Sequence, residues 1–137
     1  EAYASAERFP GARLIVADSF DSALSKLDIP ENAYIVIVTR GHRDDMRVLR
    51  WAVDQNARYL GMIGSKRKVL SIYKELEQEG IPASKFERIH APVGLEIGAV
   101  TPEEIAVAIC AELIAIRRQA DVSALSKARP IHDRSAR

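Results

Sequence analysis

The sequence predicts an α/β protein in which a parallel sheet carries helices on both faces. Short apolar runs of strand length alternate with longer stretches whose apolar residues recur at helical spacing. Residues 33–39 (AYIVIVT) are the clearest strand, because their β-branched, uniformly apolar side chains suit the middle of a parallel sheet. Residues 59–63 are a second buried strand, bounded by glycines. Each of these strands is followed by a helix, as a parallel connection requires.

Length and composition fit one domain of ordinary character. The chain has 137 residues, of which 47% are hydrophobic and 28% charged. A net charge of +1 gives no reason to expect a nucleic acid or a membrane surface as partner, and no apolar run is long enough to span a bilayer. Cys110 is the only cysteine and no signal peptide is visible, which favours the cytoplasm. Because the chain starts at Glu1 rather than Met, we expect a fragment or a trimmed protein.

The remaining elements follow in order along the chain. Short strands are expected at residues 14–17 and 89–93, the second as an edge or loop because Pro92 cannot donate to a ladder. Helices are expected at residues 21–27, 44–55, 65–79, 85–88 and 101–119. Residues 1–119 then make one domain, and residues 120–137 a basic, loosely ordered tail.

The last helix has the most distinctive sequence. Thr101 suits the N-cap, Pro102 fits the first helical position, and Glu104 completes a capping box. The helix is apolar around most of its circumference, so we expect it to be buried against the sheet or at an interface between subunits. Cys110 lies in its middle among apolar neighbours and is expected to belong to the core.

Three cations follow the strand at residues 59–63. Ser65 is a good N-cap residue, and the helix after it opens with residues 66–68 (KRK). The first turn of a helix already carries positive character, so this arrangement repels itself unless an anion lies there. The alternative is a solvated basic turn, because basic residues also open ordinary surface helices.

Topology brings further unusual residues to the same place. The loops at residues 39–42, 61–68 and 90–98 leave the carboxyl ends of expected parallel strands. Those ends meet at one edge of the sheet, where sheets of this kind bind ligands. The residues expected to face one crevice there are Arg40, His42, Ser65, Lys66, Arg67 and His90. Together they predict a site for an anionic ligand, most simply one that carries phosphate.

No pattern for catalysis or metal binding stands out. His42, His90 and His132 have no close group of Cys, His or carboxylate partners, so no metal site is expected. No Ser–His–Asp arrangement or carboxylate pair indicates hydrolysis. Asp44 and Asp45 most simply complement the positive N-terminus of their helix. For His42 and His90, a ligand or acid–base role stays open beside a structural one.

Four segments, taken together, resemble a known family. They are YIVIVTRGHRDD, YLGMIGSKRK, RIHAPVGLEIGA and TPEEIAVAICAELIAIRR. In this order and spacing they are similar to the C-terminal Rossmann-like domain of the xanthine dehydrogenase accessory factor (XdhC/CoxI) family, across residues 3–118. The positions that match the family's motifs, and are thereby implied to bind its cofactor, are Thr39, Arg40, Gly41, His42, Gly61, Gly64, Ser65, Lys66, Arg67, His90 and Gly94.

The resemblance implies an accessory protein rather than an enzyme. The family is implied to help mature molybdenum hydroxylases by binding the molybdenum cofactor and promoting its sulfuration and insertion into the apo-enzyme. The partners expected from the resemblance are therefore a molybdenum hydroxylase apo-enzyme and a sulfurtransferase. The alternatives are an NAD(P)-binding oxidoreductase, suggested by the fold alone, and a non-catalytic assembly domain.

The chain departs from the family pattern at its beginning. The family's domain opens with a strand, a G-x-G-x-x-G turn and a second strand, and no such turn occurs in this chain. We therefore expect the first strand–helix–strand unit to be lacking, together with a separate N-terminal domain whose cysteine is thought to matter in the family. Without the glycine turn, NAD(P) binding is not favoured.

The missing unit predicts an exposed sheet edge. In the strand order 3-2-1-4-5-6, residues 14–17 would be strand three and residues 33–39 strand four, with the missing strands between them. Residues 34–38 are too apolar to stay unpaired. Another piece of the same protein or rearranged pairing could fill the gap, but a homodimer needs only one self-complementary surface. We therefore predict that a partner chain covers residues 34–38 or 14–17.

Overall fold

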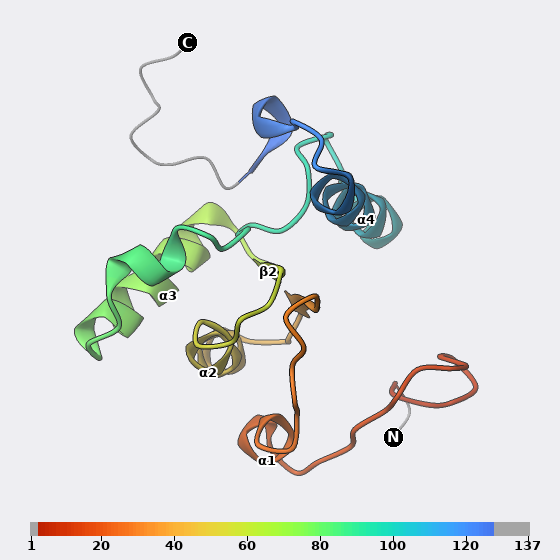
Figure 1. The fold of residues 1–137 in the computed structure, drawn as a ribbon, viewed down its shortest axis with the longest axis vertical. Helices are drawn as coiled ribbons and strands as arrows, with labels where there is room; N and C mark the ends of the chain where they lie inside the picture. The colour runs from red at the N-terminus through yellow and green to blue at the C-terminus, as the bar shows by residue number, and fades with distance from the viewer. Residues whose placement is uncertain (1–2, 128–137) are drawn as a thin grey trace.

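The computed structural model describes residues 3–127, and its centre is a pair of parallel strands with helices on both sides (Figure 1). The α/β prediction is thereby confirmed. The elements, in chain order, are α1 (Phe20–Leu24), β1 (Tyr34–Ile37), α2 (His42–Ala52), β2 (Tyr59–Met62), α3 (Lys66–Gln78), the 3₁₀ helix η1 (Ala83–Phe86), α4 (Pro102–Arg118) and the 3₁₀ helix η2 (Ser123–Leu125). Most of the predicted tail, residues 128–137, lies outside the described residues.

The sheet has the strand order that the alternation predicts. β1 pairs with β2 in parallel, with Tyr34 opposite Tyr59 and Ile37 opposite Met62. On the other side of β2, His90 forms a single parallel bridge to Gly61. Residues 89–93 therefore contribute one bridge rather than a strand, as expected of an edge segment that contains a proline.

The prediction of a strand at residues 14–17 is wrong, because the structure assigns no strand there. A strand persists only where a neighbour accepts and donates its backbone hydrogen bonds. Within residues 3–127, β1 pairs only with β2, so its outer edge offers residues 14–17 no intervening strand to pair with. Val38, just beyond β1, is 60% exposed. Cover of this edge by a second chain stays a prediction.

The helix boundaries follow their capping residues. Ser65 Oγ accepts a hydrogen bond from Lys68 N at 3.2 Å, and Thr101 with Glu104 forms the predicted capping box. α1 is capped by Ser19 rather than by Asp21, so the first helix starts one residue earlier than predicted and ends at Leu24. α2 likewise starts at His42, two residues earlier than predicted.

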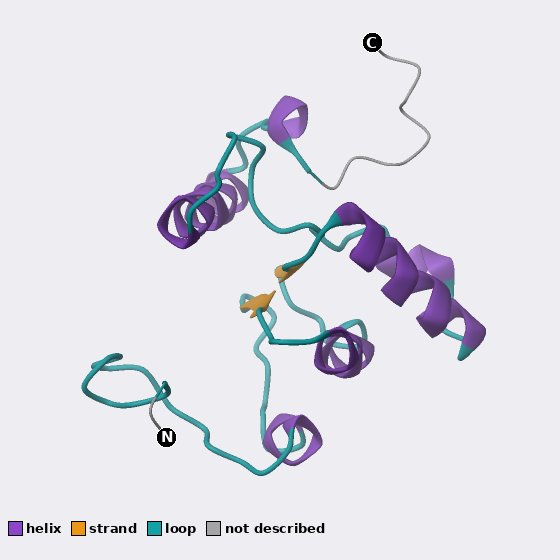
Figure 2. Ribbon diagram, turned by 180° about the vertical axis from the view of Figure 1, so that it is seen from behind, coloured by secondary structure: helices purple, strands orange, loops and turns teal. Residues whose placement is uncertain are grey.

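The two faces of the sheet are covered unequally (Figure 2). α2 and α3 pack on one face in a core that includes Ile37, Leu60 and Met62. α4 lies on the other face and buries only Ala108, Glu112 and Ala115. α4 is therefore buried against the sheet along one face, which is one of the two expected alternatives, whereas Val107 and Ile114 on its outer face are exposed. Cys110 is exposed and is not a core residue.

Candidate functional site

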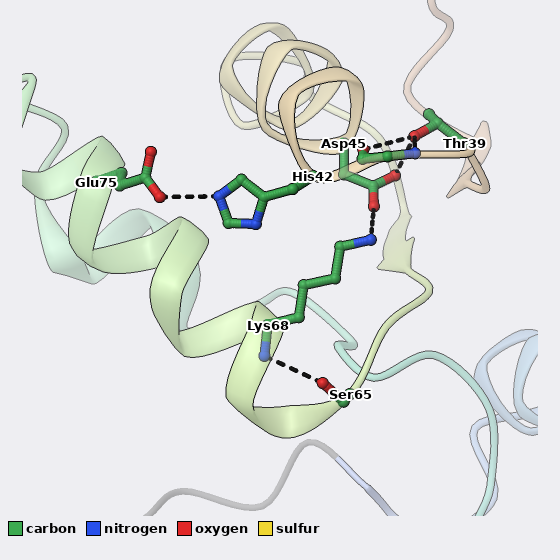
Figure 3. Close-up of polar contacts among 7 residues, drawn as sticks. Thr39, His42, Asp45, Ser65, Lys68 and Glu75 are labelled. Carbon is green, nitrogen blue, oxygen red and sulfur yellow. Dashed lines mark hydrogen bonds and ion pairs between the residues drawn. The ribbon is translucent and has the colours of Figure 1, made fainter.

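The loops that follow β1 and β2 leave the sheet side by side (Figure 3). Ile63 N donates to Ile37 O at 3.0 Å, which extends the pairing to the carboxyl ends of both strands. The first loop enters α2 through Gly41, and the second enters α3 through Ser65. Two helix N-termini, with their free backbone N–H groups, are thus brought to one edge, as the topology predicted.

A buried carboxylate joins the two loops. Asp45, in the first turn of α2, is fully buried. Thr39 Oγ1 donates to its Oδ1 at 2.6 Å, and Lys68 Nζ lies 2.5 Å from its Oδ2. Thr39 Oγ1 in turn accepts from Gly41 N at 3.3 Å, which holds the loop closed on itself. The sequence predicted only a helix-dipole role for Asp45, whereas the structure makes it the link between α2 and α3.

His42 makes a second link between the same helices. Its Nε2 lies 2.8 Å from Glu75 Oε1 on α3, and both side chains are partly exposed. This contact fixes the ring at the start of α2 and directs it toward the middle of α3 (Figure 3). The Nδ1 atom has no partner among residues 3–127 that the structure describes.

The three cations at the start of α3 are in different electrostatic situations. Lys68 is neutralised by Asp45. Lys66 and Arg67 are exposed, and neither side chain has an acidic partner within the described part of the chain. Arg40, also exposed, places its guanidinium carbon 4.7 Å from the ring centre of Tyr3. The edge therefore keeps uncompensated positive charge beside free N–H groups, which suits an anion.

Gly64 shapes the turn into α3. Its φ of 144° lies in the region that favours glycine, and a Cβ there would meet Lys68 Cδ at 3.4 Å. A side chain at this position would strain the backbone next to the capping Ser65. The glycine therefore serves the local geometry of the α3 N-terminus.

Three predicted site residues, Gly61, His90 and Gly94, lie on the side of the sheet that α4 covers. Gly94 N donates to Glu112 Oε1 at 3.2 Å, and His90 Nδ1 lies 3.5 Å from the same oxygen. A Cβ on Gly61 would come within 2.6 Å of the Tyr59 hydroxyl, so this glycine permits close packing. The structure thus brings together Thr39, Gly41, His42, Gly64 and Ser65 at the strand ends, and sets His90 and Gly94 against Glu112, with Gly61 packed beside Tyr59.

Tyr59 and Glu112 complete this second polar cluster. The Tyr59 hydroxyl donates to Glu112 Oε1 at 2.5 Å, and the Tyr59 ring stacks on the His90 ring with their centres 4.7 Å apart. Burial, assisted by the hydrogen bond to Glu112, raises the pKa of Tyr59 above its ordinary value. The hydroxyl therefore stays protonated and keeps its role as donor.

The acidic residues that organise both clusters were not predicted from the sequence. Asp45, Glu75 and Glu112 all resemble helix-surface charges, because nothing local marks them as buried or paired. The available signal for Glu112 was its position: it lies four residues after Ala108 and three before Ala115, on the small-residue face that packs on the sheet.

Neither cluster forms a metal centre. Among the described residues, no group of three or more His, Cys, Asp or Glu side chains could hold a metal ion. In the same part of the chain, every helix is too short or too polar to cross a membrane.

The surroundings of His90 predict a pH dependence of stability. Burial lowers the pKa of His90 below its ordinary value of 6.5, and the Glu112 carboxyl opposes this in part. Below pH 6.5 the unfolded chain takes up a proton before the folded one, so stability falls as the pH drops. Urea unfolding across this range should show a steeper loss for the wild type than for His90→Gln. Equal pH dependence of the two proteins would contradict this assignment.

Comparison with known proteins places this architecture in a family. The family model for the XdhC Rossmann domain matches residues 1–113. A protein of Escherichia coli, YqeB, is 35% identical over 81% of this chain and 20% of its own length. A Bacillus subtilis protein named as a probable subunit of xanthine dehydrogenase is 32% identical over 88% of this chain and 34% of its own.

A solved structure agrees with these relatives. The crystal structure of a xanthine dehydrogenase from Bacillus halodurans matches 88% of this chain and 34% of that protein, with a TM-score of 0.70 and 30% sequence identity. The chain thus spans between a fifth and about a third of the proteins it matches. The match over residues 1–113, together with the parallel strands and their helices, shows that the chain belongs to the XdhC Rossmann domain family.

Proposed function

We propose that this domain binds a phosphate-bearing cofactor at the carboxyl ends of β1 and β2, as part of an accessory protein for enzymes of the xanthine dehydrogenase type. The proposal depends on the three cations at the start of α3, of which only one has an acidic partner. Asp45 neutralises Lys68, whereas Lys66 and Arg67 face solvent with no acidic partner in the described chain. Arg40 adds a third exposed cation on the neighbouring loop.

These residues fit a phosphate group. The N-terminus of α3 offers backbone N–H groups, Ser65 supplies a hydroxyl, and Lys66 and Arg67 supply charge, which are the groups that bind phosphate at helix N-termini. His42, at the start of α2 on the neighbouring loop, is a further candidate, although its Nε2 lies on Glu75. When bound, the molybdenum cofactor would supply such a phosphate on its pterin, and the domain would hold the cofactor for transfer.

The relatives support an association with enzymes of the xanthine dehydrogenase type. Two of them carry xanthine dehydrogenase in their names. We propose a molybdenum hydroxylase apo-enzyme as partner, with a sulfurtransferase as the source of sulfur, in the cytoplasm. A homodimer is proposed as the assembly.

Mass spectrometry of the purified protein should find a pterin rather than a nicotinamide dinucleotide, and a dinucleotide would favour the oxidoreductase instead.

A phosphate titration tests the site itself. Replacing Lys66 and Arg67 together with alanine should weaken binding of inorganic phosphate by about tenfold or more, because two charge-assisted contacts are lost. The matched control is the Lys26→Ala/Lys74→Ala double variant, which removes two exposed cations that lie outside the first turn of α3. Isothermal titration calorimetry gives the affinities. Equal phosphate affinity in both double variants would contradict an anion site at α3.

A further inference from the structure

One face of α4 is apolar and open to solvent. Val107 is 61% exposed and Ile114 is 60% exposed, and the exposed Cys110 lies between them. Single exposed apolar side chains are ordinary on protein surfaces. These three recur at intervals of three and four residues, so they form one row along the helix. A row with this spacing is the seam by which paired helices pack.

The same row carries opposite charges at its two ends. Continuing the spacing leads to Glu103 in the first turn and Arg117 in the last turn of α4. Neither side chain forms an ion pair within residues 3–127. Cys110 stands halfway between them. The row is therefore acidic at its start, basic at its end and apolar in the middle.

Such a row is complementary to a second copy of itself that runs in the opposite direction. Antiparallel packing sets Val107 against Ile114 of the second copy, and Glu103 against Arg117 of the second copy, each twice. A parallel pair would instead set like charges against each other. We propose that two copies of this chain associate through antiparallel α4 helices, with the two-fold axis at Cys110.

The neighbouring positions of α4 allow this approach. Ala106 is exposed and Ala111 half-buried, so small side chains flank the seam and the helix backbones can come close. The outer edge of β1 was the surface predicted from the sequence for a dimer, and Val38 is exposed there too. The paired substitutions below distinguish that edge from α4.

Paired substitutions distinguish the two surfaces. Val107→Asp should convert the dimer to a monomer, because it buries an unpaired carboxylate in the seam. Val38→Asp is the matched control, with the same residue type and an exposed fraction of 60% against 61%, and it should stay dimeric. Sedimentation equilibrium of the full chain gives the mass. A monomeric wild type, or a dimer that is lost only in Val38→Asp, would overturn the proposal.

Charge reversal tests the direction of packing. Glu103→Arg should weaken the dimer several-fold by facing two cations at each end, and Glu103→Arg/Arg117→Glu should restore it. A double variant as weak as the single one would overturn the antiparallel arrangement. A short bismaleimide should also join the two Cys110 thiols of the wild type, with Cys110→Ser as the control. Far-UV circular dichroism establishes that each variant is folded.

Discussion

Replacing Glu112 with alanine should lower the free energy of unfolding by about 3 to 5 kcal/mol, because two buried donors lose their acceptor. Oε1 of this side chain accepts from the Tyr59 hydroxyl at 2.5 Å and from Gly94 N at 3.2 Å. Both donors stay buried after the substitution, since α4 still covers the sheet. Urea or thermal unfolding of the variant measures the loss.

A second variant at Glu112 separates the hydrogen bonds from the charge, and a variant on the surface serves as the control. Glu112→Gln keeps the shape and one acceptor oxygen, so its loss should be clearly smaller than that of Glu112→Ala. Glu77→Ala, on the exposed side of α3, should change stability little and serves as the surface control. If Glu112→Ala proves as stable as Glu77→Ala, then α4 is not anchored through this carboxyl.

Replacing Asp45 with alanine should cost about 2 to 4 kcal/mol, because it removes a hydrogen bond to a charged group and leaves Lys68 without its partner. Thr39 Oγ1 donates to Asp45 at 2.6 Å and Lys68 Nζ lies 2.5 Å away. Lys68 is partly exposed and can turn toward water, which keeps the loss below that of a wholly buried pair. Urea unfolding of the variant is the measurement.

Asp44, the neighbour of Asp45 in the sequence, provides the control. Asp44 lies in the same helical turn and carries the same charge, but its side chain is not part of the link to α3. Asp44→Ala should therefore lose only the helix-dipole contribution, about 0.3 to 1 kcal/mol. Equal losses in the two variants would show that Asp45 acts through the dipole alone, as the sequence suggested.

The local signals in the sequence predicted local structure well. The N-caps at Ser65 and Thr101 are in place, and the apolar runs of β1 and β2 pair in parallel as expected. An N-cap depends on residues within four positions, and the pairing of two strands depends on their spacing along the chain. Both can be predicted from the sequence. That the loops at residues 39–42 and 61–68 meet followed from the same topology.

Contacts between side chains of elements far apart in the sequence could not be predicted from the sequence. Asp45 and Lys68 are 23 positions apart in the sequence, and Tyr59 and Glu112 are 53 apart, so no periodicity links them. The strand predicted at residues 14–17 failed for a related reason: strand propensity is local, whereas the hydrogen bonds that make a strand come from a neighbour.

The sequence by itself determined the α/β class, the order of the elements from β1 to α3 and the placing of basic residues after a strand. Only the tertiary structure decided which of those cations are free, because Asp45 reaches Lys68 alone. It likewise decided that α4 turns its small residues inward and leaves Val107 and Ile114 exposed. Composition gives a helix its apolar residues, but the shape of the surface beneath it selects which of them are buried.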